Sequence, residues 1–231
     1  MASRNRQLVW RGLCDIDDVQ ERIAAVHFLL AADPDALRRP DRSGDSALET
    51  FVSSNDAILV CYLLRLGASP DGLSAHCPSP IHTAVYLSGG NEILCALIAA
   101  GADLDGTLVW TPLWEAILSG RLDRAELLLA NGCSVDRLCE DGETALWLAV
   151  CRKDVAACAL LMKYGADPSI RETRGGRSPR DLVPEIANAD VRVRLTALFS
   201  DAGEQARSAP PTSATPAPHS NSPTETPPNR P

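Results

Sequence analysis

The tetrapeptides Ser79-Pro80-Ile81-His82, Thr111-Pro112-Leu113-Trp114 and Thr144-Ala145-Leu146-Trp147 recur through the middle of the chain. Weaker copies begin at Ser46 and Ser178, so successive copies start 33, 32, 33 and 34 residues apart. About twenty residues after each of four of these starts comes a Gly-Ala or Gly-Cys pair, at Gly67, Gly101, Gly132 and Gly165. Two markers locked in phase predict a stack of similar units, and such a stack usually works as a binding surface.

The unit at residues 139–171 shows what each copy encodes. Asp141-Gly142 predicts a turn, and Thr144 is placed to cap a short helix that runs to Arg152. A second helix is expected over residues 155–163, and Gly165 then supplies a left-handed C-terminal cap. Helices this short are marginal alone, so each pair must bury its apolar side against the neighbouring pair.

This unit resembles the ankyrin repeat, with Thr-Pro-Leu-His opening an inner helix and Gly-Ala-Asp following the outer helix. The resemblance implies an all-α repeat solenoid of stacked helix-turn-helix units with β-hairpin fingers. Four repeats are expected, at residues 41–73, 74–106, 107–138 and 139–171. Residues 1–40 are interpreted as a divergent N-terminal capping repeat and residues 172–200 as a degenerate C-terminal capping repeat.

The chain departs from the family pattern at two places. The position of the family's histidine is occupied by Glu49, His82, Trp114 and Trp147. Tryptophan can preserve the packing and one hydrogen-bond donor there, whereas Glu49 leaves the first full repeat open to question. The repeat at 74–106 carries an extra residue around Ser88-Gly89-Gly90, which predicts a lengthened turn between its helices.

Composition limits the classes of function and the location. The net charge of −8 argues against general nucleic-acid binding, which needs basic residues to neutralise phosphates. The most apolar run, residues 57–64, is too short to cross a bilayer, so no membrane contact is expected. The N-terminus shows no hydrophobic signal segment, and several of the eight cysteines occupy apolar helical positions. These features predict a cytoplasmic or nuclear monomer with reduced thiols.

The last segment of the chain has a different composition. Residues 201–231 contain eight prolines with Ser, Thr, Ala and Asn and show no apolar periodicity. Such a segment cannot bury enough surface to offset the entropy lost on ordering. We therefore predict a disordered tail over residues 201–231.

No motif in the chain predicts catalysis or a cofactor. A glycine-rich phosphate loop and a Gly-x-Ser-x-Gly elbow are both missing from the sequence. The nearest metal-like group is Cys77 with His76 and His82, although His82 is more simply the structural histidine of its repeat. Cys151 lies beside Arg152 and Lys153, which would favour its thiolate. A non-enzymatic protein without metal or cofactor is expected, and a thiol-based enzyme or redox sensor is the alternative.

The resemblance also implies where a partner binds, because hairpin tips and inner-helix ends line a concave face in a stack of this kind. The residues that the repeat phase places there are His76, Tyr86, Leu87, Leu108, Trp110, Leu118, Ser119, Glu140, Glu143 and Arg152. An apolar centre with a polar rim is typical of protein-binding surfaces, and Trp110 is the expected hot spot. The alternative is that Tyr86, Leu108 and Trp110 pack under the adjacent hairpin.

A second candidate surface is basic. Arg171, Arg174, Arg177 and Arg180 recur every third residue, and four guanidinium groups together could hold a phosphate or an acidic peptide. The alternative is a solvated cap at the end of the stack. The overall hypothesis is a protein-protein interaction module that acts as a scaffold, adaptor or inhibitor. A subunit of a ubiquitin ligase or of another enzyme complex is a further alternative.

Overall fold

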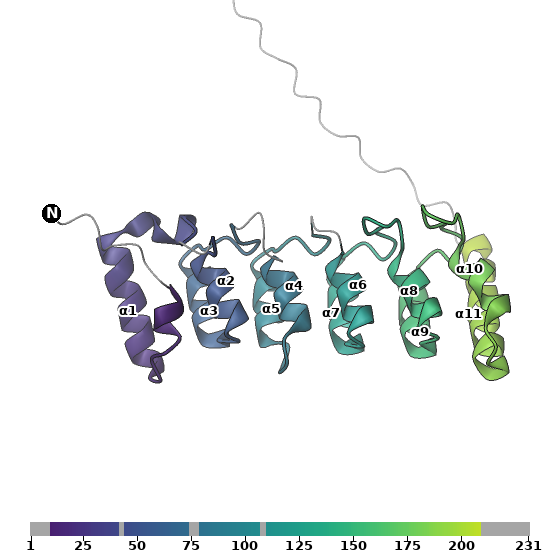
Figure 1. Cartoon of the computed structure of the whole chain (residues 1–231), viewed down its shortest axis with the longest axis horizontal. Coiled ribbons are helices and arrows are strands. Elements are labelled where there is room, and N and C mark those ends of the chain that lie inside the picture. Colours follow the sequence, from purple (N-terminus) through teal and green to yellow (C-terminus); the bar gives the residue numbers. More distant parts are fainter. Residues whose placement is uncertain (1–9, 42–43, 74–78, 107–109, 209–231) are drawn as a thin grey trace, which may run out of the picture.

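A computed structural model describes residues 10–41, 44–73, 79–106 and 110–208, and these ranges contain helices but no strand. Antiparallel helix pairs follow one another along a single axis (Figure 1). The pairs are α2 (Ala47–Ser53) with α3 (Ala57–Arg65), α4 (Pro80–Tyr86) with α5 (Glu92–Ala99), α6 (Pro112–Leu118) with α7 (Leu122–Ala130), and α8 (Ala145–Cys151) with α9 (Val155–Lys163). The all-helical solenoid expected from the repeat is therefore confirmed.

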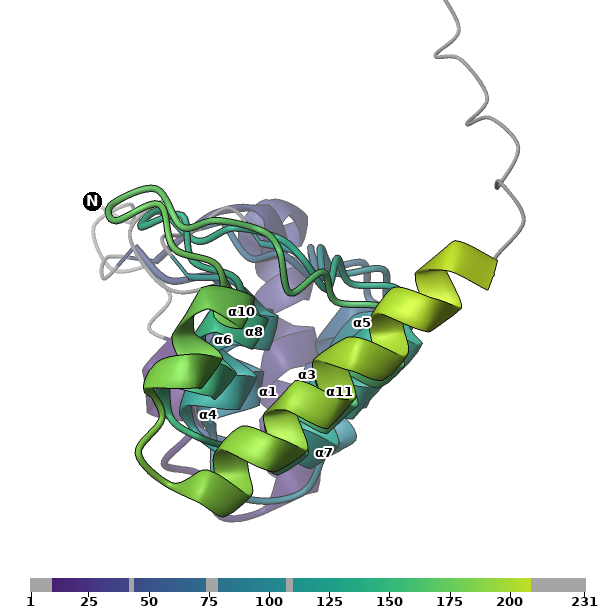
Figure 2. The same ribbon diagram turned by 90° about the vertical axis from the view of Figure 1, so that its right-hand side faces the viewer.

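The helices form two layers. Seen end-on, α4, α6, α8 and α10 (Pro179–Leu182) lie in one row, the inner layer, while α3, α5, α7 and α11 (Ala189–Ser208) lie in the outer layer (Figure 2). Helices α2, α4, α6 and α8 each pack against the next inner helix, as well as against their own outer partners. The connecting loops gather beside the inner layer and form the fingers (Figure 2).

Capping side chains explain where these short helices begin. Thr111 and Thr144 each accept a hydrogen bond, at 3.0 and 3.1 Å, from the backbone N–H three residues further on. Ser46 makes a reciprocal capping box with Glu49, whose carboxylate accepts from the Ser46 N–H at 2.5 Å. The first full repeat therefore forms although glutamate replaces the histidine there.

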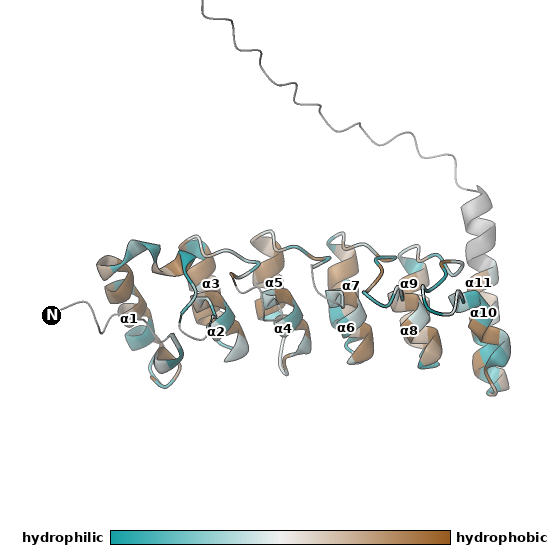
Figure 3. Ribbon diagram, turned by 45° about the horizontal axis from the view of Figure 1, so that its top comes forward, coloured by the Kyte–Doolittle hydropathy of each residue, from teal (hydrophilic) through white to brown (hydrophobic). Residues whose placement is uncertain are grey.

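One hydrophobic core runs through the whole stack. Figure 3 shows hydrophobic residues along the paired helices and mostly hydrophilic residues in the loops. Leu63, Leu128 and Leu161 occupy equivalent positions in α3, α7 and α9, and all three are fully buried. Because each helix pair covers the apolar side of the next, the units are stable only together.

The fingers correct one part of the predicted fold. The sequence led us to expect β-hairpins, but the described fingers are turns without strands. In the fourth repeat the Cys139 N–H donates to the Glu143 carbonyl at 3.0 Å, and in the first the Asp41 N–H donates to the Asp45 carbonyl at 2.8 Å. Each of these fingers is closed by one backbone hydrogen bond, and the next helix begins almost directly after it. Too few residues remain for a second pair of strand hydrogen bonds.

The N-terminal unit keeps only one full helix, α1 (Val19–Ala32), which is preceded by the 3₁₀ turn η1 (Trp10–Leu13) and followed by η2 (Pro34–Arg38). Helix α1 is tied to α3 by an ion pair between Arg22 and Asp56. Since η1 packs against α2, it takes the place that an inner helix would fill.

The C-terminal unit ends the stack with α10, the turn η3 (Val183–Glu185) and α11. Helix α11 continues to Ser208, so it extends past residue 201, where the sequence predicted the tail to begin. Residues 201–208 contain no proline and include good helix formers, which lets the helix continue until the first proline approaches at Pro210. The rest of the predicted tail, 209–231, lies outside the described residues. No described helix has both the length and the apolar character that crossing a bilayer requires.

A buried arginine joins the second and third repeats. Arg124 on α7 is only 1% exposed. The equivalent positions of α3, α5 and α9, counted back from the glycine that ends each helix, carry the apolar residues Leu59, Ile93 and Ala157. Its guanidinium donates to the last carbonyls of α4 and to the turn that follows. The acceptors are the carbonyls of Ala84 (2.9 Å), Val85 (2.6 Å), Leu87 (2.6 Å), Gly89 (2.9 Å) and Gly90 (3.4 Å), and Asn91 Oδ1 (3.1 Å). The predicted lengthened turn at 88–90 therefore wraps around this side chain.

Candidate interaction surface

The inner helices leave one side uncovered by the outer layer. In α6, Leu113, Ala116 and Ile117 are buried, whereas Leu118 and Ser119 are only partly buried. At the equivalent end of α4, Tyr86 is 69% exposed and Leu87 is partly buried. The apolar centre predicted on the inner helices thus includes one large side chain that the protein's own packing does not cover.

Trp110 lies in the finger that precedes α6, and it is both packed and accessible. Its ring stacks on Trp114, with 5.4 Å between the centroids and 9° between the planes, yet Trp110 remains 46% exposed. Trp114 is only 8% exposed. One face of the Trp110 indole is therefore covered by Trp114 and the remainder is open to solvent.

His82 holds the Trp110 finger in place. Its Nε2 lies 2.6 Å from the Trp110 carbonyl and its Nδ1 lies 2.8 Å from the Ser79 hydroxyl. A carbonyl can only accept, so Nε2 carries the proton and the Ser79 hydroxyl donates to Nδ1. Burial lowers the pKa of His82, although the bond to Trp110 and the charge of Asp103 raise it in part. This supports the structural role for His82.

Two other expected members of this surface cannot be placed. His76 and Leu108 lie outside the described residues, as does Cys77. Within the described ranges, no group of three or more His, Cys, Asp or Glu side chains is arranged to hold a metal ion.

The two tryptophans that replace the repeat histidine keep its packing but not its hydrogen bond. The indole Nε1 atoms of Trp114 and Trp147 are buried and have no acceptor among the described residues. The expectation that tryptophan preserves a donor at this position is therefore wrong. The indole nitrogen lies elsewhere on a larger ring, so it does not meet the finger carbonyl that imidazole reaches.

The finger of the fourth repeat, which comes after the one that contains Trp110, carries several carboxylates. Glu140 is exposed, Asp141 and Glu143 are partly buried, and Arg152 is exposed at the end of α8. Burial raises the pKa of Glu143, and the neighbouring Asp141 and Glu172 raise it further, whereas Arg174 lowers it. The polar rim predicted at this end is thus more acidic than basic.

Glu115 is a member of this region that the sequence analysis missed. It is partly buried on α6, directly after Trp114, and burial raises its pKa. Its carboxylate forms no ion pair within the part of the chain that the structure describes. Its position in the sequence could have identified it. Glu115 lies one helical turn before Leu118 and Ser119, so it shares their side of α6.

The four arginines at the C-terminal end do not converge on one point. Arg171 donates to the Gly176 carbonyl at 2.6 Å, Arg174 pairs with Asp141, Arg177 pairs with Glu185 at 2.6 Å, and Arg180 donates to the Phe199 carbonyl at 3.1 Å. Each guanidinium therefore already has a partner within the chain. This pairing favours the solvated cap over an anion site.

The described cysteines are all unpaired, and the environment of three of them opposes thiolate formation. Burial raises the pKa of Cys133 and of Cys158 to about 12. For Cys151, desolvation and then the Glu143 charge raise the pKa to about 11, so the cationic neighbours Arg152 and Lys153 do not activate it. A nucleophilic thiolate is disfavoured at these three positions.

Alkylation of Cys151 by iodoacetamide is therefore expected to accelerate roughly tenfold per pH unit between pH 7 and 9, because the thiolate fraction rises that way well below the pKa. Mass spectrometry of the Cys151 peptide measures the rate, and Cys95, exposed on α5, serves as the accessible reference. A Cys151 rate that levels off by pH 8 would instead indicate an activated thiol.

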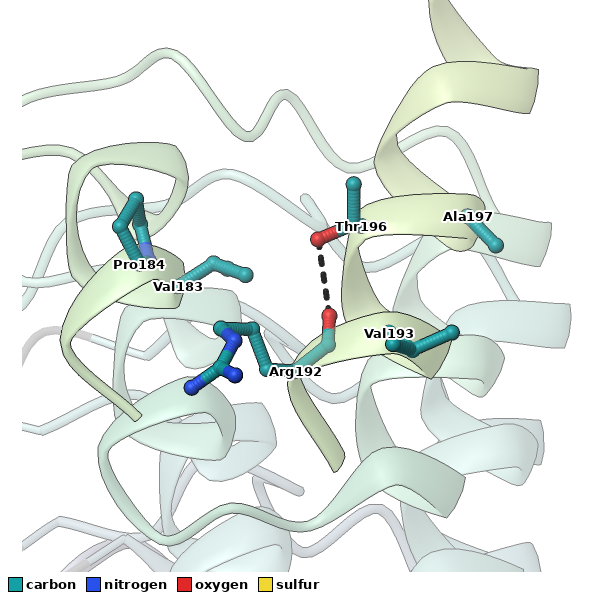
Figure 4. A pocket seen from close by; sticks show the side chains of 6 residues that line it. All are labelled: Val183, Pro184, Arg192, Val193, Thr196 and Ala197. Atoms are coloured by element: carbon teal, nitrogen blue, oxygen red, sulfur yellow. Dashed lines mark hydrogen bonds between the residues drawn. The ribbon is translucent and has the colours of Figure 1, made fainter. Parts of the chain in front are cut away.

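A groove lies at the C-terminal end of the stack, between η3 and α11 (Figure 4). Val183, Pro184, Val193 and Ala197 give it an apolar lining, and the Thr196 hydroxyl donates to the Arg192 carbonyl at 2.8 Å. The Arg192 guanidinium donates to the Ile186 carbonyl at 2.7 Å. This lining offers no pair of titratable groups for acid-base catalysis.

Comparison with known proteins agrees with the repeat architecture. Residues 81–172 match a family model described as ankyrin repeats, in three copies. The chain is 38% identical over 76 residues to the ankyrin repeat domain-containing protein oryK of Aspergillus oryzae, which covers 31% of this chain and 12% of the relative. It is 35% identical over 100 residues to an ankyrin repeat-containing protein of Treponema pallidum, covering 42% and 34%.

A third relative is a channel protein. The chain is 31% identical over 131 residues to the transient receptor potential cation channel subfamily A member 1 homolog of Caenorhabditis elegans, which covers 56% of this chain and 11% of the relative. The chain thus spans about a third or less of the length of these three relatives.

Proposed function

Because this chain belongs to the ankyrin-repeat family, we propose that it is a non-enzymatic interaction module that binds a protein partner on its concave face. The concave face is the side formed by the inner helices α2, α4, α6 and α8 and by the fingers. Ankyrin repeats indicate a protein-protein interaction module. Scaffold, adaptor and inhibitor are the roles consistent with that activity.

The observation that carries the proposal is the exposure of two aromatic side chains, one at the end of α4 and one in the finger before α6. Tyr86 and Trp110 are 69% and 46% exposed, although the stack has an ample apolar interior in which to bury such groups. Partly buried Leu87 follows Tyr86, and partly buried Leu118 occupies in α6 the position that Tyr86 occupies in α4. Large aromatic groups ringed by half-buried and polar residues are the arrangement that most often dominates binding free energy.

The double variant Tyr86→Ala/Trp110→Ala is expected to reduce recovery of a bound partner at least tenfold, since two aromatic hot spots commonly contribute more than 2 kcal/mol each. The measurement compares proteins captured from an extract of the source cells by the wild-type chain and by the variant, using quantitative mass spectrometry. Circular dichroism checks that the variant keeps its helix content.

The matched control is Phe28→Ala, which removes a 76% exposed aromatic group from α1 in the N-terminal unit. We expect it to capture the same partner as the wild-type chain. Partners lost with Phe28→Ala but kept by the double variant would contradict binding on the concave face.

A further inference from the structure

The chemistry of the surface around Trp110 indicates which kind of partner segment it accepts, an inference that rests on the function proposed above. Trp114 covers one face of the Trp110 indole, at 5.4 Å between centroids. The 46% exposure of Trp110 must then come mainly from the opposite face and the ring edge. The face of an indole ring carries negative electrostatic potential and attracts cations, and tryptophan does so more strongly than any other side chain.

Repeat register assigns two carboxylates to the same side of the stack as this aromatic pair. Glu115 follows Trp114 on α6, and Glu143 occupies in the next finger the position that Trp110 occupies in its own, directly before the capping threonine. Adjacent repeats lie about 10 Å apart, so one extended peptide can contact both fingers. Glu115 and Glu143 are both partly buried.

Neither carboxylate forms an ion pair within the described part of the chain. Of the basic side chains near the fourth finger, Arg174 pairs with Asp141 and Arg177 pairs with Glu185, while Arg152 is exposed at the far end of α8. Burial raises the pKa of both glutamates, and for Glu143 the charge of Arg174 offsets the rise only in part. A cation brought by a partner would compensate it.

We propose that the partner segment held on the concave face is basic, and that an arginine or lysine of it lies on the free face of Trp110 with its charge toward Glu115 and Glu143. An aromatic face and two carboxylates suit a guanidinium or ammonium group and repel an acidic segment. The net charge of −8 also speeds the encounter with a basic segment.

The test uses a phage-displayed library of random dodecapeptides selected on the full chain. We expect the selected peptides to share an arginine or lysine. For the tightest of them, fluorescence anisotropy should show binding weakened roughly tenfold when citrulline replaces the arginine or norleucine the lysine, and similarly with the Glu115→Gln/Glu143→Gln variant. Trp110→Leu, which keeps an apolar side chain, should weaken binding by a similar factor.

The matched control is Asp35→Asn/Glu92→Gln, which removes two exposed carboxylates from η2 and α5 and should change affinity less than twofold. A selection without basic binders, or neutral replacements and glutamate variants that bind as well as their parents, would overturn the inference. If such peptides still depended on Tyr86 and Trp110, the proposed function would stand. Peptides insensitive to both aromatic residues would contradict the proposed function as well.

Discussion

Replacing Arg124 by methionine is expected to lower the free energy of unfolding by about 3–5 kcal/mol. The guanidinium of Arg124 donates to five backbone carbonyls of the preceding repeat and to Asn91, and it is almost completely shielded from water. Methionine fills much of the same volume but donates no hydrogen bond. The C-terminal carbonyls of α4 would then lose both their donor and the positive charge that complements the helix dipole.

Two further variants separate this explanation from a loss of packing. Arg124→Lys keeps the charge but not the branched set of donors, so an intermediate loss is expected. Arg121→Met changes an arginine three residues earlier, whose side chain makes no hydrogen bond among those the structure describes, and it should cost less than about 1 kcal/mol. Urea unfolding followed by circular dichroism measures all three. Equal small losses for Arg124→Met and Arg121→Met would show that the buried guanidinium is not what joins the two repeats.

Truncation of Leu128 to alanine is expected to cost about 2–5 kcal/mol, because it leaves a cavity in a fully buried part of α7. The loss should affect the whole stack, since neighbouring repeats are stable only through their shared interfaces. Thermal unfolding followed at 222 nm should therefore show one transition that shifts to lower temperature.

Leu127 provides the internal control for that prediction. It is the adjacent leucine on α7 but is only partly buried, so Leu127→Ala should lose clearly less stability than Leu128→Ala. If the two variants lost equal stability, the assignment of Leu128 to the inter-repeat core would be wrong.

The helix pairs could be predicted from sequence because their signals are local. Capping residues such as Thr111 and Thr144 mark helix starts, and glycines such as Gly165, with a φ of 85°, mark helix ends. Repetition at one period then fixes how the pairs stack, since each pair presents the same apolar side. The fold class could therefore be predicted without information on long-range contacts.

The features that could not be predicted depend on partners in a different repeat. Arg124 meets carbonyls 34–40 residues earlier in the chain, and no local pattern shows that the lengthened turn at 88–90 surrounds it. One signal was present, because an arginine stands where the other outer helices carry leucine, isoleucine or alanine. A charged residue in a column of apolar ones indicates a specific buried partner.

The candidate surface was only partly predictable for a similar reason. Repeat phase indicates which positions leave the core, and Tyr86 is exposed as that phase requires. It does not show how a finger side chain packs, so the stacking of Trp110 on Trp114 could not be anticipated. The regular spacing of the four arginines likewise does not show that each guanidinium has a partner within the chain.

Hydrogen exchange followed by mass spectrometry, on the chain alone and with its captured partner, tests the central claim most directly. Binding on the concave face predicts slower exchange in the segments around Tyr86 and Leu87 and from Trp110 to Ser119, with little change in α5 and α7. Slower exchange confined to the outer helices, or to the groove between η3 and α11, would contradict it.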